Sequence, residues 1–223
     1  MLIQTFNTNR IKHKELWDAV EVNDLDALGQ YLEHYEEKTG EELKEGELYD
    51  HTGNSMIHKA ASLGHAEALM LLLERTGAKP DIPNASLATP LHLACKNNRV
   101  DAAKFLVGCG VDANAQDEHG QMPLLICCIH GHYDLAKLLI DASISGHLPE
   151  ALESGQRDHR GLSPLNCAAI KGDFDMARLL LINAGASVDG QSPKGCTPLL
   201  YAARGGYAEV VRFLLLKGAS PLR

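Results

Sequence analysis

The segment Thr89-Pro90-Leu91-His92-Leu93-Ala94-Cys95 decides how this 223-residue chain folds, because versions of it recur along the sequence. Its second residue has counterparts at Met56, Pro123, Pro164 and Pro198, so the five positions lie 34, 33, 41 and 34 residues apart. A period of about 33 residues is typical of a stack of similar small units. Such stacks offer extended surfaces, so the repetition favours binding over catalysis.

Each unit is predicted to contain a turn, a short helix and a longer helix. Asp117-Glu118-His119-Gly120 has Asp opening and Gly closing a four-residue turn, as type I turns favour. Ser163-Pro164 and Thr197-Pro198 then begin a helix, because the hydroxyl accepts a hydrogen bond from a free backbone N–H and Pro at the first position loses none. Pairs such as Gly131-His132 break this helix, and a second, Leu-rich helix ends near a glycine such as Gly218.

A turn, two helices and a loop in each period resemble the ankyrin repeat. The resemblance is carried by Thr89-Pro90-Leu91-His92-Leu93-Ala94, the Gly-His pairs at 64–65 and 131–132, and Gly218-Ala219. It implies an all-α solenoid of stacked helix-turn-helix units with hairpin tips, in a single domain. Five repeats are expected over residues 50–223, at about 50–81, 82–114, 115–155, 156–189 and 190–223.

Residues 10–49 are predicted to form an N-terminal capping helix pair followed by an acidic loop. The stretch 16–32 has the pattern of a helix pair, with Asn23-Asp24 at the break. From Glu33 to Asp50, eight acidic residues stand against two lysines. This stretch is either a solvated loop or helix end, or a contact for a basic partner.

The third repeat carries an insertion of about eight residues near 142–156, judged from the longer interval. It is either a tolerated surface loop or a finger that touches a partner, and residues 149–152 are expected to form an extra helical turn. The last repeat ends with an apolar second helix over 210–216. We therefore expect this chain to be the N-terminal part of a larger protein, and its uncapped C-terminal repeat offers a route to self-association.

The composition limits the functional classes. The formal net charge of −8 argues against nucleic acid as the main partner, and no apolar stretch is long enough to cross a bilayer. Six cysteines without a CxxC pair, in a chain without a recognisable signal peptide, indicate a reducing compartment, the cytoplasm or the nucleus.

In the ankyrin family, partners generally lie against the turn tips and the exposed face of the first helices. Carried over by position, the resemblance implies a groove that is apolar in the middle and rimmed by cations. We expect it to accept a protein segment with apolar anchors and some acidic residues, unless the apolar side chains belong to the core. The groove residues are Lys59, Leu93, Lys96, Ile126, Ile129, His130, Cys167, Ile170, Lys171, Tyr201 and Arg204, and the tip residues are His119, His159 and Arg160.

No catalytic, cofactor-binding or metal-binding residues are expected. His58 and His92 are motif histidines, to which the resemblance assigns a role in bracing turns, and Cys127 and Cys128 are expected to be buried. The function is thus predicted to be protein–protein interaction. The alternatives are a regulatory or substrate-targeting domain of a larger enzyme (a kinase or ubiquitin ligase) or of a channel, and a stand-alone inhibitor that occludes another protein's site.

Overall fold

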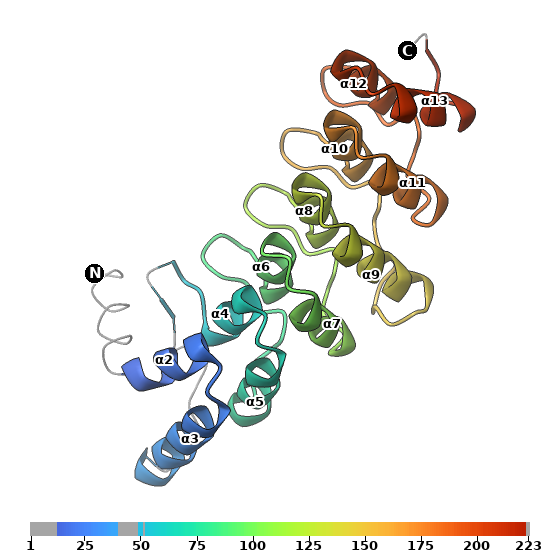
Figure 1. Cartoon of the computed structure of the whole chain (residues 1–223). Helices are drawn as coiled ribbons and strands as arrows, with labels where there is room; N and C mark the ends of the chain where they lie inside the picture. The colour runs from blue at the N-terminus through green and yellow to red at the C-terminus, as the bar shows by residue number, and fades with distance from the viewer. Residues whose placement is uncertain (1–12, 40–48, 51, 222–223) are drawn as a thin grey trace. The chain divides into compact units, whose positions relative to one another are not determined.

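The computed structural model describes residues 13–39, 49–50 and 52–221, which contain twelve helices and no strand. The chain divides into two compact units, Met1–Val111 and Asp112–Arg223. Each unit is a stack of helical hairpins, and the colours of Figure 1 follow them along the chain. The all-helical architecture expected from the repeats is confirmed.

The N-terminal unit consists of three helix pairs. Its helices are α2 (Lys14–Val22), α3 (Leu25–Thr39), α4 (Met56–Leu63), α5 (Ala66–Thr76), α6 (Pro90–Lys96) and α7 (Val100–Gly108). The first helices pack in the order α2, α4, α6, and the second helices in the order α3, α5, α7. Helices α2 and α3 confirm the helix pair predicted for 16–32, with Asn23 in the left-handed conformation (φ 58°) between them. Helix α3 reaches Thr39, whereas residues 10–12 and 40–48, with most of the expected acidic loop, lie outside the described residues.

The C-terminal unit repeats this arrangement. Its helices are α8 (Pro123–His130), α9 (Tyr133–Ile144), α10 (Pro164–Lys171), α11 (Phe174–Ile182), α12 (Pro198–Gly205) and α13 (Ala208–Leu216). Helix α10 packs against both α8 and α12, and α11 packs against both α9 and α13. Within this unit, Figure 1 shows α8, α10 and α12 in one row and α9, α11 and α13 in another, with the hairpin loops projecting beyond the first row.

The helices begin where the local sequence predicts. Ser163 Oγ accepts a hydrogen bond from Asn166 N, and Thr197 Oγ1 accepts one from Leu200 N, each at 3.3 Å. Proline occupies the first helical position behind both caps, where its missing N–H costs no hydrogen bond. The starts of α10 and α12 are therefore marked by residues within the same turn.

The hairpin tips are closed by one recurring turn. Asp117 Oδ1 accepts hydrogen bonds from the N–H groups of His119 and Gln121, each at 2.9 Å, while the Gly120 N–H donates to Asp117 O at 2.9 Å. Gly120 has φ +71°, a conformation that glycine adopts without strain. The corresponding position of another tip holds Leu87, at φ +59° and 54% exposed. This non-glycine residue stores backbone strain in the turn.

A buried histidine joins consecutive repeats in the N-terminal unit. His58 is 0% exposed, and its Nδ1 accepts a hydrogen bond from Ser55 N at 3.2 Å. Because Nδ1 is an acceptor, the ring proton is on Nε2, which donates to Ala88 O in the next repeat at 3.0 Å. Burial lowers the pKa of His58 to about 4, so the ring is neutral at pH 7.

Asparagine takes over this role in the C-terminal unit. Asn166 is 0% exposed and occupies the place of His58 in its own repeat. Its Oδ1 accepts a hydrogen bond from Ser163 N at 3.1 Å, and its Nδ2 donates to Gly190 O at 3.3 Å. An amide thus also bonds the N–H of its own cap residue and a carbonyl of the next repeat, here Gly190 O, without a titratable group.

The insertion in the third repeat is an ordered loop. Helix α9 continues to Ile144, but residues 149–152 form no helical turn, so that expectation is wrong. The reason is that the Asn114 side chain engages this backbone in an open conformation: its Nδ2 donates to Ala151 O and its Oδ1 accepts from Glu153 N, each at 2.9 Å. The Leu152 N–H also donates to Ser143 Oγ at 2.9 Å. These bonds compete with helical ones for the same backbone groups.

Candidate protein-binding face

The first helices of the C-terminal unit present a mixed apolar and basic surface. Ile170 is 40% exposed, and Ile129 and Tyr201 are half-buried. The Tyr201 hydroxyl donates to Ser192 Oγ at 3.1 Å, which fixes the ring against its own hairpin. Lys171 and Arg204 are exposed in the last turns of α10 and α12. We call these five residues the inner face of the C-terminal unit.

His130 extends this face at the end of α8. Its side chain is exposed, and its ring stacks on that of His132 with the ring centroids 5.6 Å apart. The two rings are nearly parallel, at an interplanar angle of 13°. This contact orients the His130 ring at the end of α8.

Two predicted groove residues belong to the core instead. Ile126 is 4% exposed and Cys167 is 5% exposed. Both lie on helices that pack directly together, because α8 and α10 are in contact. Their side chains therefore fill the space between first helices and offer no surface to a partner, which corrects the sequence-based assignment for these two positions.

The predicted residues of the N-terminal unit are placed unevenly. Lys96 is exposed at the end of α6, and Leu93 is half-buried on the same helix. Lys59 is half-buried, with its Nζ 3.5 Å from Glu21 Oε1 on α2. This ion pair partly neutralises the Lys59 charge within the unit.

The hairpin tips of the C-terminal unit are exposed and linked to one another. The backbone N–H of His159 donates to His119 O at 2.9 Å, which fixes the spacing between two successive tips. Arg160 is also exposed, but its guanidinium lies 2.8 Å from the buried carboxylate of Asp158. The two histidine side chains remain accessible, whereas Arg160 mainly braces its own turn.

The buried cysteines are poor candidates for chemistry. Cys127 and Cys128 are 0% and 1% exposed, which confirms their predicted burial. Burial raises the pKa of the Cys128 thiol well above its usual range and raises that of Cys167 to about 12. Both thiols stay protonated near pH 7 and are weak nucleophiles. No group of three or more metal-ligating side chains converges among the described residues.

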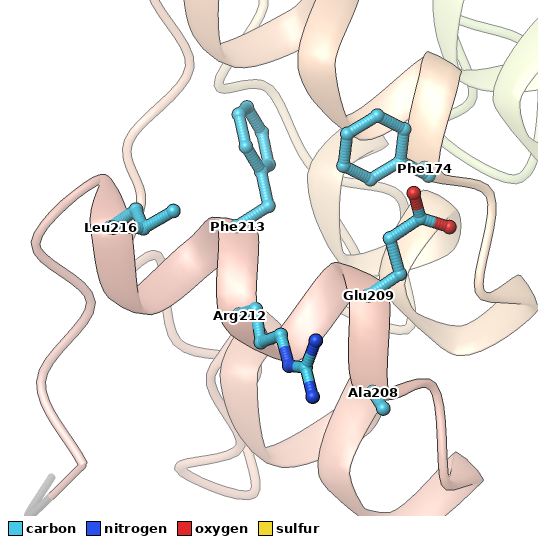
Figure 2. Close-up of a pocket in the computed structure, with 6 residues that line it drawn as sticks. All are labelled: Phe174, Ala208, Glu209, Arg212, Phe213 and Leu216. Atoms are coloured by element: carbon cyan, nitrogen blue, oxygen red, sulfur yellow. The ribbon is translucent and has the colours of Figure 1, made fainter.

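A hollow on the second helices was not foreseen from the sequence. It has a volume of about 500 Å³ and lies between α11 and α13. Figure 2 shows the rings of Phe174 and Phe213, whose centroids are 5.2 Å apart, and the Arg212 side chain extending away from them. Ala208 begins α13 where Tyr133 begins α9 and Phe174 begins α11, so a small side chain lines the hollow at this position. An alignment of these three helix starts in the sequence could have indicated the hollow.

The chain belongs to the ankyrin-repeat family. The family description "Ankyrin repeats (3 copies)" matches residues 16–117, 81–149, 103–190 and 124–223. Repeats of this family are in general protein-interaction modules. The match also confirms the solenoid fold expected from the sequence. No helix in the described part of the chain is both long and apolar enough to cross a membrane.

Curated proteins and solved structures are similar to this chain. The B-cell lymphoma 3 protein homolog of Mus musculus is 31% identical over 175 residues, covering 77% of this chain and 38% of the relative. The nuclear factor NF-kappa-B p105 subunit of Mus musculus is 28% identical over 177 residues, covering 78% of this chain and 14% of the relative. The crystal structure of the ankyrin repeat domain of Bcl-3, a member of the IkappaB protein family, superposes with a TM-score of 0.78 at 24% identity. It covers 92% of this chain and 86% of that one.

Proposed function

We propose that this chain is a non-catalytic binding module that holds a protein segment on the inner face of its C-terminal unit. The observation that supports it is the exposed apolar side chain of Ile170 on α10, a helix that packs against both α8 and α12, which carry half-buried Ile129 and Tyr201. Lys171 and Arg204 are exposed in the last turns of α10 and α12. Apolar anchors surrounded by polar groups are the usual composition of a protein-binding surface. The exposed tip histidines, His119 and His159, supply further contacts in this unit, and Lys96 is a separate candidate contact in the N-terminal unit.

The test compares two exposed isoleucines, one on the first helix and one on the second helix of the same repeat. Ile170→Asp alters the inner face, whereas Ile182→Asp alters a 56% exposed side chain on the second helix of the same pair. The intact protein and both variants are used as affinity baits, and each captured protein is then titrated directly against purified baits. We expect I170D to lose binding and I182D to keep it. Unchanged affinity of a folded I170D variant excludes the inner face.

A second role is that of a targeting or regulatory segment within a longer protein. The transient receptor potential cation channel subfamily A member 1 of Drosophila melanogaster is 28% identical over 219 residues, covering 77% of this chain but only 17% of the channel. The chain likewise spans less than two fifths of the Bcl-3 homolog. Sequencing the complete transcript tests this role, and a reading frame that encodes only these residues excludes it.

Self-association through the last helix pair is the remaining element of the proposal. Leu200 and Leu215 are 38% and 45% exposed and border a hollow of about 260 Å³. The residue that corresponds to Leu200 in the preceding pair, Asn166, is fully buried. A second copy covering this uncharged edge would be detected by sedimentation as a concentration-dependent dimer, which Leu215→Glu should abolish. A monomer at all concentrations excludes self-association.

We place the protein in the cytoplasm or nucleus, which fluorescence imaging of a tagged chain checks.

A further inference from the structure

The first helices of the C-terminal unit carry no carboxylate. Helices α8, α10 and α12 contain neither Asp nor Glu, and each has a basic residue in its last turn: His130, Lys171 and Arg204. The whole chain, in contrast, has a formal net charge of −8. This row of helices therefore has the opposite sign to the molecule that carries it.

Lys171 and Arg204 are free to pair with a partner. Both side chains are exposed, and neither forms an ion pair with any residue that the structure describes. The carboxylate nearest to Lys171 in sequence, Asp173, already accepts a hydrogen bond from Met176 N at 3.0 Å as the cap of α11. Arg160 differs, because its guanidinium is paired with Asp158 at 2.8 Å.

An apolar side chain lies beside these charges. Ile170 is 40% exposed and directly precedes Lys171, and Tyr201 lies one helical turn before Arg204. Apolar contact excludes water and thereby strengthens a neighbouring ion pair. A polyanion such as nucleic acid needs a run of cations along its backbone, which Lys171 and Arg204 alone do not supply.

The spacing of the helices restricts the form of an acidic segment. Packed helices lie about 8–10 Å apart, which sets the scale between the last turns of α10 and α12. A chain in the polyproline II conformation advances about 3.1 Å per residue with three residues per turn, so residues three apart lie on one side at about 9 Å. Carboxylates with this spacing follow the repeat of the helices, with one carboxylate for each of α10 and α12.

We infer that the partner of the inner face is an extended acidic protein segment, with carboxylates three residues apart that pair with Lys171 and Arg204 and an apolar residue between them that contacts Ile170. This inference rests on the proposed function and specifies its ligand. Binding is then driven partly by charge, and it weakens as the salt concentration rises.

The experiment is a selection from a random heptapeptide library displayed on phage. The baits are the wild-type chain, K171E/R204E, and the control K137E/R212E, which makes the same change in net charge at two exposed second-helix positions. Circular dichroism establishes that each bait is folded. Synthetic copies of the selected peptides, and a single-stranded DNA oligonucleotide, are then titrated against all three baits and against the I170D variant.

The inference expects wild-type and K137E/R212E baits to select peptides with Asp or Glu at positions i and i+3. K171E/R204E should bind these peptides roughly tenfold more weakly. Selected peptides that lack acidic residues but lose binding with I170D overturn the inference and leave the proposed function standing. Failure to select any peptide overturns both, and tighter binding of the oligonucleotide than of the peptides overturns the acidic-segment assignment.

Discussion

Acidification should destabilise the N-terminal unit through a single buried histidine. His58 Nδ1 accepts a hydrogen bond from Ser55 N, so a proton added there would place two donors face to face. The ring is also fully buried, and its burial is the main cause of a pKa lowered to about 4. The folded unit therefore resists a proton that the unfolded chain accepts readily.

The size of the effect follows from the two pKa values. Histidine in an unfolded chain has a pKa of about 6.5, so the unfolded state binds the proton first as the pH falls. The free energy of unfolding is unaffected by His58 above that pH, decreases between about pH 6.5 and pH 4, and becomes constant below. From a folded pKa of about 4, the loss between about pH 7.5 and pH 5 amounts to about 2 kcal/mol.

Urea denaturation followed by Trp17 fluorescence measures this loss. Trp17 is the single tryptophan of the chain and is buried on α2, within the unit that contains His58. His58→Asn is the comparison, because Asn166 makes the equivalent bond to its own cap residue and also bonds a carbonyl of the next repeat. H58N should lose about 2 kcal/mol less stability than wild type between the two pH values. Equal losses in the two proteins would refute the assignment to His58.

Two further predictions concern backbone strain and the inserted loop. Leu87→Gly should raise the stability of the N-terminal unit by roughly 0.5–1 kcal/mol in the same urea assay, because glycine relieves the strain at φ +59°. The control Leu87→Ala keeps the strained conformation. An equal gain of stability in both variants would contradict this reason. Asn114→Ala removes both side-chain bonds to the inserted loop, at a cost of about 1–2 kcal/mol. Hydrogen exchange at residues 151–153 should accelerate in N114A while exchange in α10 stays constant, and unchanged loop exchange would show that Asn114 is not needed.

Local residue patterns were sufficient to predict the helices. The Ser-Pro and Thr-Pro starts at 163–164 and 197–198 cap their helices as expected, because a cap involves residues only three positions apart. The break at Asn23 likewise depends on its own left-handed conformation. The backbone of the inserted loop was predicted incorrectly, because its bonding partner Asn114 lies 37 to 39 residues away in sequence.

The sequence by itself determined the repeat, the order of the helices and the family, since these depend on periodic short-range signals. The exposure of individual groove positions depended on tertiary packing. Ile126 and Ile170 are the same residue type on neighbouring first helices, yet the first is 4% exposed and the second 40%. The difference arises because contact between adjacent helices covers one side of each helix and leaves the other in water, which only the folded stack decides.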